Sequence, residues 1–182
     1  SASSIVTAAG GMVINTGTIT GASFGLTLGG TGNGNMQSLI NTGTGTLTKI
    51  GTGIWTLSAD NEFTGLTTIS GGTLRLGTAG NATNGPLGTI TNGVNITAGA
   101  LDLNGFTLAT AEPITVRGVG ITSGALTNSS ATAVDYSGLV TIGAISTIGT
   151  NAGDLNLTHT GTITGAFALT LSGSGNEIIV SI

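Results

Sequence analysis

Cysteine is absent from this chain of 182 residues, and charged and aromatic side chains are scarce. Without cysteine, neither a disulfide bond nor a thiolate metal site can form. Charged residues make up 5 % of the chain, against roughly 25 % in an ordinary soluble domain. The three basic residues, Lys49, Arg75 and Arg117, are scattered, so no basic patch is available to neutralise a phosphate backbone. We therefore expect no nucleic-acid partner.

Long apolar runs are also missing. No stretch approaches the roughly 20 residues that a membrane-spanning helix needs, so no membrane insertion is expected. The first residues, Ser1 to Val6, show neither the charged region nor the apolar region of a signal peptide. A cleaved signal peptide and a longer parent chain both stay open.

The chain is instead rich in glycine, with 34 residues, and threonine is about as common. Disordered chains combine low hydrophobicity with high net charge, whereas this chain is 38 % hydrophobic with a net charge of −4. Its apolar residues alternate with polar ones in short runs that end at Gly, Asn or Asp, as residues 43–77 show. Such alternation is typical of strands joined by turns, so we expect an ordered all-β protein.

A repeat recurs over two length scales. Residues 16–33 read TGTITGASFGLTLGGTGN and residues 160–176 read TGTITGAFALTLSGSGN, so the chain is expected to end in the phase in which it began. A shorter unit of about 21 to 27 residues is marked by one inward apolar ladder. The members of this structural ladder are Leu26, Leu47, Leu74, Leu101, Leu126, Ile148 and Leu169. Ile148 is included because the interval from Leu126 to Leu169 is about two repeat units long.

These periods predict a parallel β-helix, or β-solenoid. Two further apolar series fill the intervals, so each coil should hold three short strands, and about seven coils should stack on one another. Glycine and asparagine are expected at the corners, where turns need a positive φ. Residues 1–182 then form a single solenoid segment, with residues 77–88 as a surface loop and Pro86 ending it.

The register makes a specific prediction about two charged residues. Arg75 and Asp102 occupy the same outward strand position on adjacent coils, so they should form a cross-coil pair. An exposed pair of this kind would contribute only ~0–1 kcal/mol. Lys49 falls where an inward residue belongs, and we expect a turn or a bulge there.

The segment from Gly53 to Leu74, GIWTLSADNEFTGLTTISGGTL, resembles the autotransporter-associated β-strand repeat of Gram-negative passenger regions. It departs mildly from the usual pattern at Glu62 and Phe63, where Thr and Tyr are commoner. Specific resemblance covers about a third of the chain. It implies a right-handed parallel β-helix, export to the cell surface, and a role as stalk, adhesin or fibre, with no catalytic residues to transfer.

Residues that could carry chemistry are few. Glycoside hydrolysis needs two carboxylates about 5–9.5 Å apart, and only Asp60 and Glu62 are close in sequence. Arg75 with Asp102 is the one combination that polysaccharide lyase chemistry could use, and His159 has no partner motif. Trp55 and Tyr136 could stack on a sugar but suit packing better. We expect no catalytic residue, no cofactor and no metal site, and hence no enzyme.

We therefore predict a structural extracellular β-solenoid, a fibre, filament or stalk element of a secreted bacterial surface protein. Neither end of the chain resembles a polar cap, so its partner should be another copy stacked head to tail or the adjoining solenoid of a longer chain. The alternative is an adhesin segment that binds glycans or cell surfaces through the 77–88 loop or the threonine-lined faces. An ice-binding β-helix is less favoured, because Arg75 and Asp102 interrupt a face of threonines. A polysaccharide-degrading β-helix is less favoured because the acidic residues offer no convincing catalytic pair.

Overall fold

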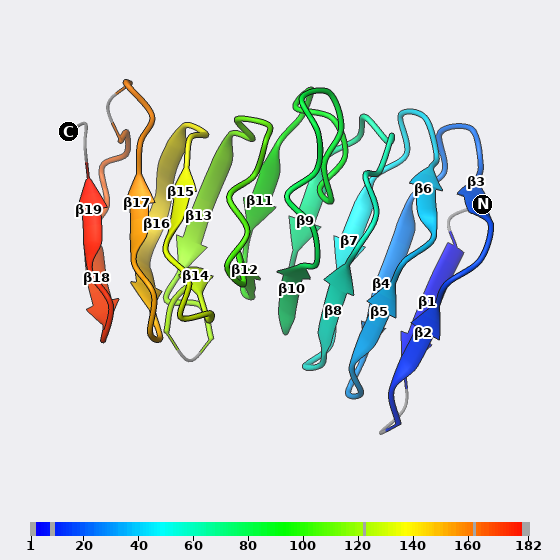
Figure 1. Cartoon of the computed structure of the whole chain (residues 1–182), viewed down its shortest axis with the longest axis horizontal. Helices are drawn as coiled ribbons and strands as arrows, with labels where there is room; N and C mark the ends of the chain where they lie inside the picture. The colour runs from blue at the N-terminus through cyan, green and yellow to red at the C-terminus, as the bar shows by residue number, and fades with distance from the viewer. Residues whose placement is uncertain (1–2, 8–9, 122, 162, 180–182) are drawn as a thin grey trace.

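The computed structural model describes residues 3–7, 10–121, 123–161 and 163–179. Within these ranges all regular structure is β-strand, and no helix is long and apolar enough to cross a membrane. The strands stack side by side into a rod whose axis runs across Figure 1, with the first turn at one end and the last turn at the other. The expected all-β solenoid is confirmed, with about eight turns.

Two faces of the rod carry a strand in nearly every turn. The strands of the first face are β1 (Ser3–Thr7), β4 (Leu26–Gly30), β7 (Leu47–Lys49), β9 (Thr67–Ile69), β11 (Val94–Ile96), β13 (Ile114–Gly118) and the start of β16 (Val140–Thr150). Those of the second face are β2 (Met12–Ile14), β5 (Gly34–Met36), β8 (Ile54–Leu57), β10 (Thr73–Leu76), β12 (Ala100–Asp102), β14 (Leu126–Asn128), the end of β16 and β18 (Leu169–Gly173).

The third face holds strands only toward the two ends of the rod. These strands are β3 (Thr18–Thr20) and β6 (Leu39–Asn41) near one end, and β15 (Val134–Tyr136), β17 (Leu155–Leu157) and β19 (Glu177–Ile179) near the other. The turns between β6 and β15 close with loops instead, which cluster at the centre of Figure 1. The three-strand coil is therefore complete only in the outer turns.

Period-two alternation places one apolar set of side chains inside the rod. Paired residues on successive turns of the first two faces are 19 to 28 positions apart, and each inward residue packs on its equivalent in the next turn. Leu28, Leu57, Leu74 and Ile96 are 0 % exposed. Burial of each such side chain stabilises the fold by about 1.5–3 kcal/mol, so the core is one continuous column along the axis.

The expected leucine ladder combines residues of two different faces. Leu26 pairs with Leu47 on the first face, but the next partner of Leu47 is Thr67, not Leu74. Leu74 pairs instead with Trp55 of the preceding turn on the second face. The expected step from Leu47 to Leu74 is therefore wrong.

The rest of the ladder follows the second face as far as Ile148. Leu74, Leu101, Leu126 and Ile148 are successive partners there. Leu169 does not continue this series, because it pairs with Ser146, while Leu171 is the residue that pairs with Ile148. Strands on all three faces point every second side chain inward. A Leu-x-Leu pattern therefore does not show which face a strand belongs to.

The two copies of the long repeat also lie on different faces. The first copy runs from β3 on the third face to β4 on the first face. In the second copy, Thr164 forms a parallel bridge with Thr141 of the first face, and β18 lies on the second face. The copies are one face out of phase, so the expectation that the chain ends in its starting phase is wrong.

Asn104 has the positive φ expected of a corner asparagine, but Asn61 and Asn128 occupy their corners for a different reason. Among the described residues, Ser23 and Asn104 are the non-glycine residues with a positive φ. Asn61 and Asn128 are 0 % exposed and use their side-chain amides to bond backbone groups of neighbouring turns. Side-chain hydrogen bonding, not left-handed backbone, thus explains why asparagine occupies these positions.

Residues 77–88 contain no strand, but only part of this segment is a surface loop. Asn81 to Thr83 are exposed, and Asn81 Oδ1 accepts bonds from the backbone N–H groups of Thr83 and Asn84 at 3.0 Å each. Gly85 to Gly88 are buried, and Leu87 belongs to the core at 2 % exposure. The second half of the segment therefore replaces a strand of the third face.

Candidate functional site

Arg75 and Asp102 lie side by side on the outer surface of the second face. Arg75 of β10 is the register partner of Asp102 of β12, and its Nε donates to Asp102 Oδ2 at 2.8 Å. The two residues therefore occupy the adjacent coils that the sequence register indicates. The pair is not exposed as expected, because the side chain of Asp102 is only 2 % accessible, whereas that of Arg75 is 31 % accessible.

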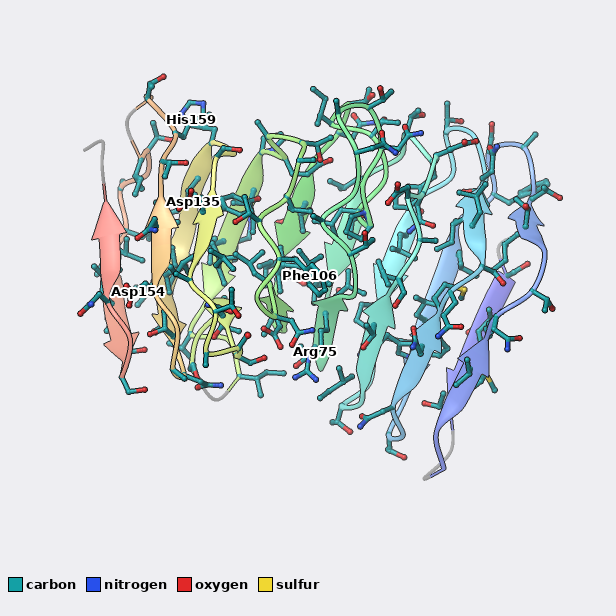
Figure 2. The ribbon with its side chains drawn as sticks, viewed as in Figure 1. Arg75, Phe106, Asp135, Asp154 and His159 are labelled. Carbon is teal, nitrogen blue, oxygen red and sulfur yellow. The ribbon has the colours of Figure 1, made fainter. Side chains whose placement is uncertain are left out.

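Ile121 and Ser123, which lie between β13 and β14, line the same cavity as the pair. Ser123 lies against the outer surface, where its backbone carbonyl accepts a hydrogen bond from Ser172 Oγ at 2.9 Å. A side chain at Gly149 would place its Cβ 2.3 Å from the same carbonyl, so glycine is needed for this close approach. Figure 2 shows Arg75 at the lower edge of the rod.

Asp102 uses all of its acceptor capacity within the protein. Oδ1 accepts from the backbone N–H groups of Asn104 and Ser129, both at 3.0 Å. Oδ2 accepts from Ser129 Oγ at 2.7 Å in addition to Arg75 Nε. A carboxylate held by four donors is a structural acceptor rather than a general base, which must be free to take a proton. The geometry therefore gives no support to lyase chemistry at this pair.

A cavity of about 120 Å³ opens beside the pair. Its lining combines hydroxyl, amide and small apolar side chains with the guanidinium group: Ile54, Thr73, Arg75, Ala100, Asp102, Ile121, Ser123, Thr127, Ser129 and Asn151. Thr127 is 6 % exposed, and its hydroxyl has no hydrogen-bond partner. We call this the Arg75 groove. Its chemistry suits the binding of a small polar group.

The other acidic residues considered from the sequence do not converge. Asp60 Oδ2 accepts from Asn81 Nδ2 at 2.9 Å, and Glu62 Oε2 accepts from Asn41 Nδ2 at 2.6 Å. Their partners belong to opposite neighbouring turns, so the two carboxylates bond in opposite directions along the rod. This arrangement does not fit a pair of glycosidase carboxylates.

His159 lies at the upper edge of Figure 2, opposite Arg75. Its Nδ1 accepts a bond from the backbone N–H of Gly161 at 2.8 Å, which closes a local turn. Within the described ranges, no group of three or more His, Asp or Glu side chains is placed to hold a metal ion. Histidine therefore contributes to turn geometry here.

Trp55 and Tyr136 are buried and cannot stack on a sugar at the surface. Trp55 is 0 % exposed, and its Nε1 donates to the carbonyl of Gly29 at 3.0 Å. Tyr136 is 1 % exposed, and its hydroxyl donates to the carbonyl of Glu112 at 2.8 Å. Both rings are part of the core, and both polar atoms are satisfied.

Lys49 does not cause the expected bulge. It occupies a regular inward position between Leu28 and Ile69 on the first face and is 0 % exposed. Its Nζ donates to the carbonyls of Ile50, Gly51 and Gly71 at 2.8, 3.3 and 3.0 Å, and burial lowers its pKa to about 8. The long aliphatic stem lets the charge reach the polar corner of the coil.

Glu112 is a buried acid that sequence reasoning did not single out. It is 1 % exposed, and neither carboxyl oxygen has a hydrogen-bond partner. Burial raises the pKa of Glu112 to about 7, because a low-dielectric environment disfavours the charged form. Burial first, and the charge of Glu112 second, raise the pKa of Tyr136. In the sequence, the only indication that Glu112 is buried is its position just before strand β13, which is itself buried.

The first face carries a single file of outward polar residues. The aligned members are Ser4, Thr27, Thr48, Thr68, Asn95, Thr115, Thr141 and Thr164. Two positions further along the strands lie Gly29, Ile50 and Ser70, so no second aligned row of threonines accompanies the first. The paired Thr-x-Thr array that ice binding would need is not formed on this face.

Comparison with protein families gave one match. Residues 47–76, which run from the start of β7 to the end of β10, match the model of the passenger-associated-transport-repeat family. Comparisons with curated proteins and with solved structures found no match. The matched strands form consecutive turns of a β-solenoid, and this segment fits a repeat of an autotransporter passenger.

Proposed function

We propose that this chain is a structural segment of a secreted bacterial surface protein, in which the solenoid acts as a stalk or fibre. The observation that carries the proposal is the match of residues 47–76 to a passenger-associated repeat within a continuous solenoid. The carboxylates are dispersed or fully bonded within the described residues, which favours a structural over a catalytic role.

We further propose that the end turns stack on more solenoid. Inward side chains there are partly open: Met12 is 37 % exposed, although its neighbours along the second face, Gly34 and Trp55, are buried. At the other end Leu171 is 42 % exposed, whereas its partner Ile148 is 0 % exposed. Open apolar positions and a free strand edge fit one further turn, from a second copy or from adjoining chain.

Electron microscopy of the untagged chain over a dilution series tests this proposal. Fibres that lengthen with concentration would support stacking between copies. Dispersed short rods would mean that the neighbouring turns come from a longer chain. Loss of rod shape at every concentration would contradict the structural role, because a stalk must keep its own fold.

A further inference from the structure

The Arg75 groove contains donors that the protein itself leaves unused. In the described part of the chain, Arg75 makes its hydrogen bond through Nε to Asp102, and its two terminal Nη groups have no protein partner. The hydroxyl of Thr127 is also unpartnered although it is buried. Buried polar groups are normally hydrogen-bonded, so the free hydroxyl of Thr127 indicates that a ligand or solvent completes it. The Nη groups of Arg75 belong to a side chain that is 31 % accessible, so they can bond the same ligand.

The groove offers donors and no free charged acceptor. Asp102 is the carboxylate in the lining, and four donors already occupy it. Asn151 adds an amide whose Oδ1 accepts from Ser123 Oγ, which leaves its NH₂ group for other partners. The complementary ligand therefore carries an acceptor, and a planar carboxylate fits the fork of Nη donors on a guanidinium group.

The rest of the lining favours a sugar over an acidic peptide. The groove is lined by the side chains of Thr73, Ser123, Thr127 and Ser129 as well as by Arg75, and Ile54 and Ile121 add a small apolar part. The volume of about 120 Å³ corresponds to about four water molecules at ~30 Å³ each. That space holds a carboxylate and the adjoining edge of one ring, whose hydroxyls can bond the surrounding side chains.

We propose that the Arg75 groove binds the carboxylate-bearing edge of an acidic sugar unit, such as a uronate. The Nη groups of Arg75 hold the carboxylate, and Thr127 and Asn151 bond oxygens at its side. The Arg75–Asp102 pair fixes the guanidinium, because Nε is anchored to a carboxylate that is itself held by Ser129 and Asn104. This binding site is independent of stacking between solenoids.

Titration of the folded protein with D-glucuronate, followed by ¹H–¹⁵N NMR, tests the proposal. We expect saturable shifts of the Arg75 Nε–H and Ser129 amide signals, with a dissociation constant of about 1 mM for so small a ligand. D-glucose, which lacks the carboxylate, and acetate, which lacks the ring, should each bind at least tenfold more weakly. Equal effects of acetate and glucuronate would overturn the sugar assignment, and no saturable shift would overturn the site.

Two variants locate the binding. Arg75→Lys keeps the charge that neutralises buried Asp102 but loses the donor fork, and Thr127→Val removes the free hydroxyl without touching the ion pair. Each should weaken glucuronate binding about tenfold or more. Arg117→Lys is the matched control, since Arg117 bonds Gly143 of the first face. Unchanged affinity in Thr127→Val, with its amide spectrum otherwise intact, would contradict the proposal even if Arg75→Lys failed to fold.

Discussion

Single buried side chains hold neighbouring turns together where the third face lacks strands. Asn61 Oδ1 accepts from the backbone N–H of Ile40 at 2.9 Å, and its Nδ2 donates to the carbonyl of Pro86 at 2.7 Å. Its own backbone N–H donates to Gly85 at 3.0 Å. One residue therefore connects the turn before it with the loop of the turn after it, in place of a strand ladder.

Asn61→Ala is expected to lower the free energy of unfolding by about 2–4 kcal/mol. The substitution leaves the buried N–H of Ile40 and the buried carbonyl of Pro86 without partners, and each unsatisfied group costs about 1–3 kcal/mol. Urea denaturation measures the effect. Asn41→Ala is the control, because Asn41 is exposed and bonds only the exposed carboxylate of Glu62. Equal losses in both variants would contradict the role assigned to Asn61.

Glu112 should make stability depend on pH. Its folded pKa of about 7 lies above the ordinary value of 4.5, so between these values the folded chain binds more protons than the unfolded chain. The free energy of unfolding therefore falls as the pH rises from 4.5 to 7. Glu112→Gln should remove this slope and be more stable than the unsubstituted protein at pH 8, by on the order of 1–2 kcal/mol after allowance for solvent screening.

Chemical denaturation at pH 4.5 and pH 8 measures this difference. Glu62→Gln serves as the control, since Glu62 is exposed and should leave the pH profile nearly unchanged. If Glu112→Gln kept the full slope between the two pH values, another group would have to be responsible for it.

At the scale of elements, the contact between β5 and β8 shows how tightly successive turns are stacked. Gly34 pairs directly with Trp55, and a Cβ at Gly34 would lie 2.5 Å from the indole ring. The indole is 0 % exposed and hydrogen-bonded, so it has little room to move. A tryptophan fits into the core at position 55 because Gly34, its partner on the preceding turn, has no side chain.

Gly34→Ala is expected to lower the free energy of unfolding by about 1–3 kcal/mol, the usual result of overpacking a core. Gly10→Ala provides the comparison, because nothing lies within 4 Å of a Cβ at Gly10, and it should change stability little. Thermal or urea unfolding measures both. A Gly34→Ala protein as stable as the Gly10→Ala protein would show that the indole shifts freely.

The sequence predicted the elements well and their assignment to faces less well. Alternation with regular spacing was enough to infer stacked strands, and shared outward positions placed Arg75 beside Asp102. The prediction that Leu47 and Leu74 belong to one ladder was nevertheless wrong, because inward leucines have the same sequence pattern on every face. Lys49 and Glu112 were not expected in the interior, since burial of a charge depends on carbonyls and loops contributed by other turns.

The candidate groove could not be predicted for the same reason. Its floor comes from the second face, but Ile121 and Ser123 of its lining come from the connection between β13 and β14, whose length alone does not show where it folds. The carboxylate of Asp102 is buried among Arg75, Asn104 and Ser129. The pair that the strand positions predicted to be exposed is therefore an anchored part of the Arg75 groove.

At the scale of the whole molecule, each turn is a separable unit. Residues 47–66 make one complete turn, because Leu47 and Thr67 are register partners. Deletion of these 20 residues should leave a folded rod shorter by one strand spacing of ~4.8 Å, as expected of repeat proteins in which each unit contacts only its neighbours. Circular dichroism and small-angle scattering measure fold and length.

The control is deletion of residues 47–56, which removes only part of a turn. It removes β7 and all but the last residue of β8, so the chain that remains between the neighbouring turns is too short to close a coil, and the variant should not fold. If the whole-turn deletion unfolded the protein as completely as this partial deletion, the turns would not be separable units.

The parallel pairing of strands from turn to turn on the first two faces also gives the rod a direction-dependent mechanical strength. Hydrogen bonds between turns run nearly along the axis. Tension applied evenly across both ends loads all the bonds between two turns together, so they share the force. Tension applied to one chain terminus from the side loads a single strand, and bonds then break one after another. A rod of this kind holds under an axial pull and peels turn by turn under a lateral one.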